Sequence, residues 1–231
     1  MYQQTGRDIK RHCEITTPHT HASFEARQLA CLKGRRSLFS GINIQLHAGH
    51  ALHVRGSNGS GKSSLLRILC GLVSPEQGVV LWSGRPVHAL REEFHQYLFF
   101  HGHATGIKDD LLAWENLAFN ARLAGVHCSY AMACEALKAM DLLQAALLPA
   151  GQLSQGQRKR LALGRLYLPD LPQLLILDEA FSALDQNATA ILAAILEAHL
   201  QQGGMLIYTT HQDIHLQAPA HQELWLGERP C

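Results

Sequence analysis

A glycine-rich run in the first third of the chain carries the residue types that bind a phosphate chain. The run is Gly56-Ser57-Asn58-Gly59-Ser60-Gly61-Lys62-Ser63, followed by Ser64. Its glycines let the backbone turn tightly, so that successive N–H groups can face phosphate oxygens. Lys62 is suited to place its charge near the β- and γ-phosphates, and the Ser63 hydroxyl is suited to ligate Mg²⁺. The run therefore predicts a nucleoside triphosphate site.

The segments that flank this loop have the pattern that such a site needs. Residues Ala51–Val54 are typical of a short strand before the loop, and Ser64–Leu69 are typical of a helix after it. A strand, a glycine-rich loop and a helix in this order direct the positive end of the helix dipole at the bound anion. The alternative is a chance glycine-rich turn, which requires every pattern position and both flanks to match by accident.

Two neighbouring carboxylates follow a second apolar run. Leu174–Leu177 is predicted to be a fully buried strand, and Asp178 and Glu179 come directly after it. In a doubly wound sheet, ligands bind at the carboxyl ends of the strands. Asp178 is suited to hold Mg²⁺ opposite Ser63, and Glu179 is suited to orient or deprotonate an attacking water. The alternative is a strand that ends in a solvated acidic turn.

A third run begins a predicted helix over Gln155–Leu168. It is Leu153-Ser154-Gln155-Gly156-Gln157. Ser154 is a good N-cap residue, and Gln157, three residues on, completes a capping box. From residue chemistry alone this run is a well-capped helix start that could also hold an anion.

The remaining pattern indicates an α/β fold that positions these three runs. Crossover helices imply a parallel core sheet, and the early short strands suggest an antiparallel sheet packed beside it. Besides the segments above, the predicted strands are Phe24–Leu29, Gly41–Leu46, Val79–Trp82, Tyr97–Phe100 (of buried type), Met205–Thr209 and Glu223–Leu226, with a helix over Gln186–Gln202.

Between about residues 101 and 168 the pattern changes to helical. Apolar residues recur at helical spacing from Leu111 to about Leu147, and the later helix ends before Pro169. We therefore expect a helical subdomain inserted into one nucleotide-binding domain of residues 24–231. Residues 1–23 are polar and without a sustained period, and we expect them to form a flexible leader.

The composition argues against several classes of protein. Of 231 residues, 47% are hydrophobic and 17% charged, and the formal net charge is +1, so no basic field favours nucleic acid as a partner. The apolar stretches are too short to cross a bilayer, and the N-terminus lacks the apolar segment of a signal peptide. These features predict a cytoplasmic protein.

The cysteines and histidines form no metal-binding pattern. The six cysteines, which we expect to be free thiols in a reducing compartment, are Cys13, Cys31, Cys70, Cys128, Cys134 and Cys231. The fifteen histidines include the close pairs His19 with His21 and His101 with His103, but neither pair has further ligands at suitable spacing. We therefore predict no metal site made by protein side chains alone.

Taken together, these runs resemble the motifs of the ATP-binding-cassette (ABC) ATPases. The run from Leu153 to Gln157, after a helical insertion and before the acidic strand, is similar to the signature of that family. Ser182-Ala183-Leu184-Asp185 resembles its D-loop, and His211, after a buried strand, resembles its switch histidine. The resemblance covers about residues 24 to 226. It implies a phosphate-loop NTPase of ABC type that uses ATP and Mg²⁺.

The resemblance also implies roles that the pattern alone leaves open. In this family two nucleotide-binding domains close head to tail on two ATP molecules. Ser154, Gly156 and Gln157 would then bind the ATP held by the other copy, and Asp185 would line the interface. His211 would contact the γ-phosphate of its own ATP as a catalytic residue. One copy per chain implies a dimer of identical or similar chains, and we predict a homodimer.

Several shorter strings resemble one branch of the family, the ATP-binding subunit of the cytochrome c maturation haem exporter. They are Leu38-Phe39-Ser40-Gly41, Gly56-Ser57-Asn58-Gly59, Val80-Leu81-Trp82, Gly106-Ile107-Lys108, Trp114-Glu115-Asn116-Leu117, Gln201-Gln202-Gly203-Gly204-Met205 and Thr210-His211-Gln212. This resemblance implies a peripheral ATPase at the cytoplasmic face of the bacterial inner membrane. It would sit on integral membrane permease subunits, through the segment His101–Glu115, and couple ATP turnover to haem handling for c-type cytochrome assembly.

Two positions depart from the family pattern. Ala104 stands where the family has a glutamine, and an alanine side chain cannot contact Mg²⁺ or the attacking water. His103 is a candidate to substitute for that glutamine in part. Leu32 stands where an aromatic residue usually stacks on adenine, and it offers apolar contact without a π face. We therefore expect altered coupling or rate and a weaker preference for adenine.

Three other functions stay open at this point. The same ATPase could serve a transporter for a lipid, a peptide or a drug. A soluble ABC protein of translation or DNA repair is a second alternative, although such proteins usually carry paired cassettes, long coiled-coil insertions or zinc modules. The third is a regulatory nucleotide-binding module without turnover. Glu179 and His211 argue against that third function, and Ala104 argues for it.

Overall fold

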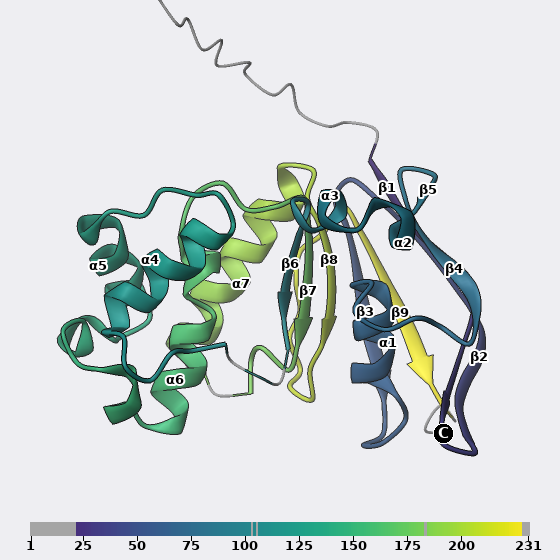
Figure 1. Cartoon of the computed structure of the whole chain (residues 1–231), viewed down its shortest axis with the longest axis horizontal. Coiled ribbons are helices and arrows are strands. Elements are labelled where there is room, and N and C mark those ends of the chain that lie inside the picture. The colour runs from purple at the N-terminus through teal and green to yellow at the C-terminus, as the bar shows by residue number, and fades with distance from the viewer. Residues whose placement is uncertain (1–21, 103, 105, 183, 228–231) are drawn as a thin grey trace, which may run out of the picture.

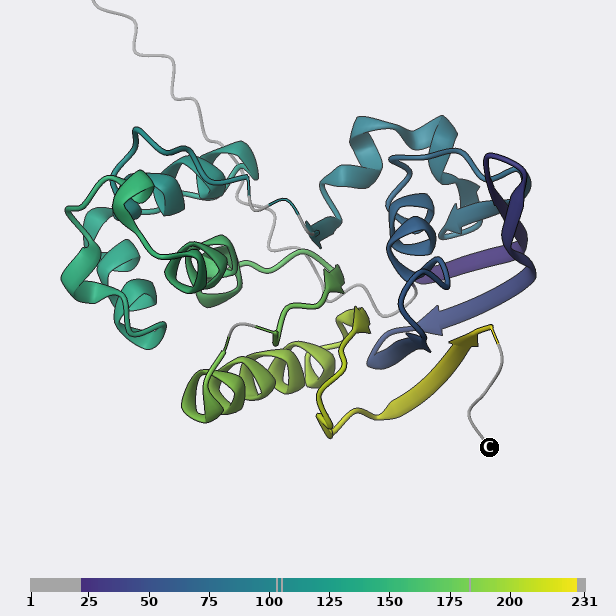
Figure 2. The ribbon, with the colours of Figure 1, turned by 90° about the horizontal axis from the view of Figure 1, so that it is seen from below.

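The computed structural model describes residues 22–102, 104, 106–182 and 184–227 of the chain. Two sheets and a group of helices follow one another along the longest axis of the molecule (Figure 1). A five-stranded sheet lies between the other two parts, and the view from below shows the same order (Figure 2). Residues 1–21, which make up most of the predicted leader, lie outside the described part of the chain, as do His103 and Ala183.

A parallel sheet of five strands forms the centre of the fold. Helix α1 (Lys62–Leu69) packs on one face of it and α7 (Gln186–Gln201) on the other. Because both faces are covered, β7 and β8 are buried along their whole length. The parallel core predicted from the crossover helices is confirmed. In their order across the sheet, the strands are β6 (Leu98–His101), β7 (Leu174–Asp178), β8 (Met205–Thr209), β3 (His50–Gly56) and β9 (Ala220–Leu226).

As predicted, an antiparallel sheet packs beside the parallel sheet, and it lies on the side that α1 covers. The two sheets and α1 share one apolar core, in which the Phe94 ring lies 6.4 Å from that of Phe24 and 5.8 Å from that of Trp82. Phe94 belongs to one of two single-turn helices, α2 (Val87–Leu90) and α3 (Glu92–His95), which are too short for a sequence pattern to indicate. In order, the antiparallel strands are β2 (Arg36–His47), β1 (Ser23–Lys33), β4 (Gln77–Trp82) and β5 (Arg85–Pro86).

The helices between β6 and β7 pack around an apolar core of their own, to which Leu117, Leu137 and Leu161 contribute. The predicted helical group is therefore present, and its role as a subdomain over residues 101–168 stays a prediction. The α-helices are α4 (Ala113–Leu123), α5 (Tyr130–Ala139) and α6 (Gln155–Ala162), and the 3₁₀ turns are η1 (Leu143–Ala145), η2 (Ala150–Gln152) and η3 (Gly164–Tyr167). In the part of the chain that the structure describes, no helix is both long and apolar enough to cross a membrane.

Two predicted elements differ from the structure. The helix expected over Gln155–Leu168 ends at Ala162, and the chain continues as a 3₁₀ turn that begins at Gly164, a poor helix former. A Cβ at position 164 would overlap the Leu117 side chain, which accounts for the glycine. The strand expected to be buried over Tyr97–Phe100 is β6, which is half-buried because it forms an edge of the parallel sheet. The strands near both ends of the described chain are longer than their predicted cores.

Candidate functional site

The glycine-rich loop joins the end of β3 to the start of α1, as predicted. Gly56 has a φ of +148°, and a Cβ there would lie 2.6 Å from both the Leu226 carbonyl oxygen and Ser60 Oγ. Gly61 has a φ of +104° and immediately precedes α1. Both positions therefore need glycine, since any side chain would meet overlap or strain. Ser57, Asn58, Gly59 and Ser60 form the turn between them, and Ser63 and Ser64 lie in the first turn of α1.

The start of α1 presents backbone donors toward the loop. Gly61 forms no side-chain cap, and the first turn holds no acidic residue, so the leading N–H groups have no acceptor within the helix. The Lys62 ammonium turns back over the loop and donates to the carbonyl oxygens of Gly56, at 2.8 Å, and Ser57, at 3.3 Å. A helix N-terminus beside an ammonium group is suited to bind phosphate. The geometry is therefore compatible with the predicted phosphate site.

The two acidic residues at the end of β7 are joined by a threonine from β8. Asp178 is 7% exposed, and its Oδ1 accepts a hydrogen bond of 2.7 Å from Thr209 Oγ1. The same Oγ1 accepts a hydrogen bond of 2.9 Å from the Glu179 amide. One hydroxyl therefore orients the carboxylate of Asp178 and the backbone of Glu179. Only β8 separates β7 from β3 in the parallel sheet, so Asp178, Glu179 and Gly56 all lie at the carboxyl ends of its strands (Figure 2).

Glu179 combines a strained backbone with a histidine neighbour. Its φ is +54°, a value that residues other than glycine seldom adopt. Its Oε1 lies 3.3 Å from His211 Nε2, and the two side chains are 30% and 58% exposed. The Ser182 amide donates to the Glu179 carbonyl at 3.2 Å and helps to hold the turn. Strain of this kind persists where the surroundings hold it, and it is concentrated at functional sites.

The loop after Glu179 is tied to the segment that carries His211. Gln212 donates through Nε2 to the Phe181 carbonyl at 3.1 Å, and its amide donates to Thr210 Oγ1 at 3.0 Å. At the far end of the loop, Asp185 caps α7 by accepting a hydrogen bond of 2.8 Å from the Ala188 amide. Asp185, predicted to line an interface, therefore has a clear structural role within its own chain.

The predicted capping box at the start of α6 is confirmed. Ser154 Oγ accepts from the Gln157 amide at 3.2 Å, and Gln157 Oε1 accepts from the Ser154 amide at 2.8 Å. Ser154 is exposed, and a Cβ at Gly156 would have nothing within 4 Å. Figures 1 and 2 both place α6 with the other helices, across the parallel sheet from α1. The capped start of α6 therefore does not join the phosphate loop of its own chain.

The segment that begins at Ala104 is anchored to the helical group. Asp109 forms an ion pair with Arg158 in the first turn of α6. Asn116, which is 1% exposed, accepts from the Lys108 amide at 2.8 Å and donates to the Lys108 carbonyl at 3.0 Å. Ala104 itself is exposed. The position at which we predict the family's glutamine therefore lies, in sequence, a few residues before Asp109, which pairs with the start of α6.

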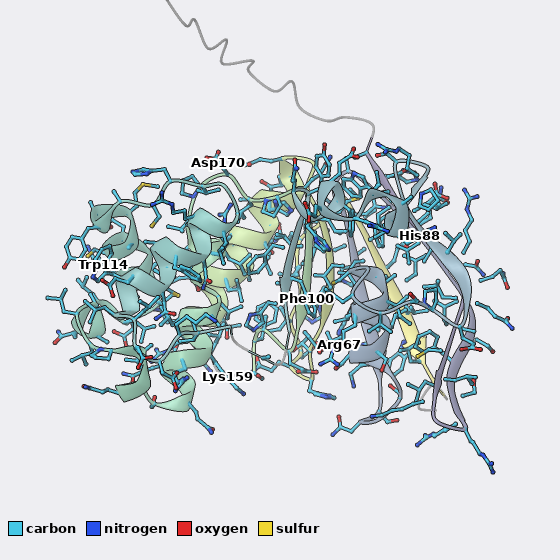
Figure 3. The ribbon with its side chains drawn as sticks, in the orientation of Figure 1. Arg67, His88, Phe100, Trp114, Lys159 and Asp170 are labelled. Carbon is cyan, nitrogen blue, oxygen red and sulfur yellow. The ribbon has the colours of Figure 1, made fainter. Side chains whose placement is uncertain are left out.

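Sequence reasoning did not place two side chains beside the acidic residues. Thr209 is hidden at the end of an apolar strand, and its only signal is a polar residue directly before the predicted switch segment. His101 ends β6 beside Phe100, which is labelled in Figure 3 and packs against the core that the two sheets share with α1. Burial lowers the pKa of His101 to about 4, Asp178 acts in the opposite direction, and Lys159 adds to the lowering. This histidine is therefore neutral at physiological pH.

The position predicted to meet adenine lies outside the apolar core. Leu32, near the end of β1, is 49% exposed, so it has surface available for a ligand.

Of the cysteines, Cys31, Cys70, Cys128 and Cys134 are free thiols, as predicted, and the other two lie outside the described residues.

Comparison with known sequences identifies the family to which this chain belongs. A family profile described as ABC transporter matches residues 39–182. The cytochrome c biogenesis ATP-binding export protein CcmA of Nitrosospira multiformis is 44% identical over 204 residues, which cover 88% of this chain and 98% of that relative. The protein of the same name in Escherichia coli strain K12 is 44% identical over 192 residues, which cover 83% of this chain and 90% of that relative.

Comparison with solved structures supports the same fold. A putative ABC transporter ATP-binding protein from Pyrococcus furiosus matches with a TM-score of 0.72 and 22% identity, over 87% of this chain and 97% of that one. A dimeric post-hydrolysis state of the ATP-binding cassette MJ0796, bound to ADP and Pi, matches with a TM-score of 0.70 and 22% identity, over 82% and 88%. At these identities the likeness concerns the fold, with its two sheets and its helical group.

Proposed function

We propose that this chain is the ATP-hydrolysing subunit of a membrane transporter. The chain belongs to the ABC transporter family and to its cytochrome c biogenesis ATP-binding export branch. It couples ATP turnover to haem handling in the assembly of c-type cytochromes. The observation that carries this proposal is 44% identity over 98% of the length of a curated relative. The phosphate loop and the acidic pair, at one edge of one sheet, support it.

The nucleotide lies on the phosphate loop with its phosphates toward α1. The backbone N–H groups of residues 57–64 and the Lys62 ammonium contact the β- and γ-phosphates, because the helix start offers unpaired donors. Leu32 provides an apolar surface for adenine. The position of Lys62 close to the Gly56 and Ser57 carbonyls supports this assignment, since the ammonium already lies over the loop.

The residues present fit a magnesium ion. Mg²⁺ prefers hydroxyl and carboxylate oxygens, which Ser63 and Asp178 supply. Asp178 is nearly buried, and no ion pair among the described residues involves it, so its charge is available to a cation. When bound, the ion neutralises charge on the β- and γ-phosphates. Thr209 keeps Asp178 oriented for this purpose.

Hydrolysis depends on Glu179 and His211. Glu179 orients the attacking water and accepts its proton, and His211 contacts the γ-phosphate, where negative charge develops. The distance of 3.3 Å between Glu179 Oε1 and His211 Nε2 supports their action on one reacting group. The bonds of Thr209 and Ser182 to the Glu179 backbone keep the carboxylate in place through the reaction.

A second copy of the chain completes each site. Ser154, Gly156 and Gln157 of one copy bind the ATP on the phosphate loop of the other, and Asp185 lies at the interface. The exposure of Ser154, and the distance of α6 from α1 across the sheet, support contact between chains rather than within one chain (Figure 1). A cassette of the same fold is dimeric in its state bound to ADP and Pi. The working unit is therefore a homodimer with two ATP molecules at its interface.

The dimer binds integral membrane subunits at the cytoplasmic face of the bacterial inner membrane. The segment from residue 104 to Glu115 receives a helix from those subunits. Its supporting features are three exposed polar residues, Lys108, Asp109 and Asp110, followed by the half-buried Leu111 and Trp114. A groove of about 680 Å³ borders this segment and is lined by Leu111, Trp114 and Phe119.

Complementation tests this function directly. An Escherichia coli strain that lacks its own 44% identical relative should regain c-type cytochromes, detected by haem staining, when it expresses the wild-type chain. Lys62→Ala and Glu179→Gln should not restore them, and the tagged wild-type chain should co-purify with integral membrane proteins after detergent extraction. Restoration by Glu179→Gln would contradict the proposal, as would purification with soluble companions alone.

A further inference from the structure

The segment that carries His211 lies beyond the last backbone bonds between β7 and β8. Strand β8 ends at Thr209, and the pair of Asp178 with Thr209 is the last of that ladder. His211 and Gln212 are both exposed, so burial does little to fix them. Exposed segments with few packing contacts open locally at low cost. The direction in which His211 points therefore depends on individual hydrogen bonds.

The side chain of Gln212 forms one such bond. Its Nε2 donates to the carbonyl oxygen of Phe181 at 3.1 Å. Because the acceptor is a carbonyl, only the NH₂ group of the side-chain amide can face it. Phe181 is fully buried and packs in the core between β7, β8 and α7. The bond therefore ties an exposed segment to a point that the core holds in place.

The same carbonyl oxygen also anchors the loop that follows Glu179. The Leu184 amide donates to it at 3.2 Å, and the Ser182 amide donates to the Glu179 carbonyl at 3.2 Å. A carbonyl oxygen has two lone pairs and can accept two hydrogen bonds. The backbone of Phe181 is thus the point at which the loop of Glu179 and the segment of His211 are joined.

Two hydrogen bonds connect this loop to this segment, one on each side of His211. Thr209, two residues before His211, accepts through Oγ1 from the Glu179 amide at 2.9 Å, and Gln212 follows His211 directly. A segment held at one point can turn about it, whereas two points fix its direction. Between the two bonds, His211 Nε2 lies 3.3 Å from Glu179 Oε1. Loss of the Gln212 bond would therefore free one end of the segment.

The space beside the segment gives it room to move once that bond is lost. A hollow of about 490 Å³ is lined by Gln212 and Asp213 of this segment and by Leu184 and Asp185, which precede α7. Groups that face open space lose the dispersion contacts that hold packed side chains together. Packing across the hollow therefore cannot replace the hydrogen bond.

We propose that Gln212 is a positioning residue, whose side-chain bond to the Phe181 carbonyl holds His211 beside Glu179. This inference rests on the proposed function, because the position of His211 matters for turnover only if the chain hydrolyses ATP. A displacement of about 1 Å in a reacting group can lower a rate by about a hundredfold. Gln212 therefore influences hydrolysis through His211, without acting on the reacting atoms itself.

Replacement of Gln212 by methionine removes this one bond. Gln212→Met keeps an unbranched side chain of similar length without an N–H group, and the backbone amide at position 212 can still donate to Thr210 Oγ1. The matched control is Gln222→Met. Gln222 Nε2 likewise donates to a backbone carbonyl, that of Gln45 at 3.2 Å, but it lies on β9, which does not adjoin β7.

The wild type and both glutamine variants are compared as full-length chains, together with His211→Ala and the double variant Gln212→Met/His211→Ala. Unfolding by urea, ATP affinity and the maximal rate of phosphate release are measured for each. The double variant is needed because a residue that acts only through His211 has nothing left to position once that side chain is removed.

If Gln212 positions His211, Gln212→Met should lower the maximal rate about tenfold, with ATP affinity unchanged. Gln222→Met should keep the wild-type rate, and the two glutamine variants should unfold at similar urea concentrations. Gln212→Met should cause no further loss in the His211→Ala background. Equal rates in the two glutamine variants would overturn the inference, as would a further tenfold loss in that background.

Histidine ¹⁵N NMR spectra decide the inference independently of hydrolysis. The ring signals that disappear in His211→Ala identify those of His211. Glu179→Gln should move these signals in the wild-type background, because the two side chains lie 3.3 Å apart, and should move them much less in the Gln212→Met background. Comparison of the two backgrounds cancels any direct effect of the neighbouring substitution on His211.

Two spectral results would overturn the inference whatever the rates. One is an equal movement of the His211 signals by Glu179→Gln in both backgrounds. The other is no movement in the wild-type background, since His211 would then not lie beside Glu179. Absence of phosphate release from the wild type would instead overturn the proposed function, and the spectra would still report whether Gln212 sets the position of His211.

Discussion

Thr209 joins Asp178 and Glu179 through a single hydroxyl. We predict that Thr209→Val, which keeps the shape of the side chain, leaves both groups without this partner. Because an unsatisfied buried polar group costs about 1–3 kcal/mol, the free energy of unfolding in urea should fall by about that amount. Phosphate release should fall as well, since the acidic pair loses its orientation. Thr210→Val is the matched control, and equal losses of phosphate release in both variants would contradict this role.

Ala104 stands where we predict the family's glutamine, and it is exposed. We predict that Ala104→Gln raises phosphate release, or its stimulation by the membrane subunits, because the restored side chain can sense the γ-phosphate and relay closure to the helical group. Affinity for ATP should change little. Ala131→Gln, at an exposed position on α5, is the control. Identical kinetics of Ala104→Gln and the wild type would mean that position 104 does not correspond to the family's glutamine.

The sequence predicts those site residues whose type is required by the local backbone conformation. Gly56 and Gly61 are needed for positive φ and close approach, and Lys62 follows them at fixed spacing, so the phosphate loop can be identified from residue types and spacing alone. Thr209 could not be predicted in this way. It is one polar residue in a buried strand, and only the strand order shows that it meets Asp178 and Glu179.

At the scale of elements, the capped start of α6 allows a test of contact between chains. We predict that Ser154→Arg abolishes phosphate release but leaves the affinity of the monomer for ATP intact, because Ser154 meets the nucleotide of the other copy. Ser129→Arg is the matched control, since Ser129 caps α5 in the same way. The loss of a cap costs about 1 kcal/mol in each case and should affect unfolding equally.

Two outcomes would contradict the assignment of Ser154 to the partner's site. A loss of ATP affinity in the Ser154→Arg monomer would mean that this residue acts within its own chain. Equal phosphate release from Ser154→Arg and Ser129→Arg would mean that Ser154 only caps its helix.

Elements with a long and regular hydrophobic pattern can be predicted from the sequence, whereas elements whose bounds depend on tertiary packing are harder to predict. The strands at Leu174–Asp178 and Met205–Thr209 match their predictions closely because every position in them is apolar or nearly so. The end of α6 could not be predicted, because one glycine at position 164 does not specify where the helix ends, and only the structure shows that Leu117 of another helix leaves no room there for a Cβ. The edge position of β6 depends on the order of the strands, which hydrophobic pattern alone does not specify.

At the scale of the molecule, the account predicts which face meets the membrane subunits. A photocrosslinking amino acid at position 108 or 109 should link to an integral membrane subunit, because these exposed positions shortly precede Leu111 and Trp114, which line the groove (Figure 3 labels Trp114). The same amino acid at position 85, on the antiparallel sheet at the other end of the molecule, should not (Figure 1). Crosslinks from position 85 alone would place the docking face on the opposite side. Leu111 and Trp114 would then serve only the core of the helical group.

The central claim is that this chain hydrolyses ATP with Glu179 as its base, in a dimer closed by ATP. The most direct measurement is phosphate release by wild type and Glu179→Gln, with ATP binding and dimer mass recorded on the same samples and Glu92→Gln as an exposed control. The account predicts intact ATP binding, a dimer stabilised by ATP, and phosphate release lowered by about a hundredfold or more in Glu179→Gln alone. Turnover of purified Glu179→Gln at the wild-type rate would contradict it.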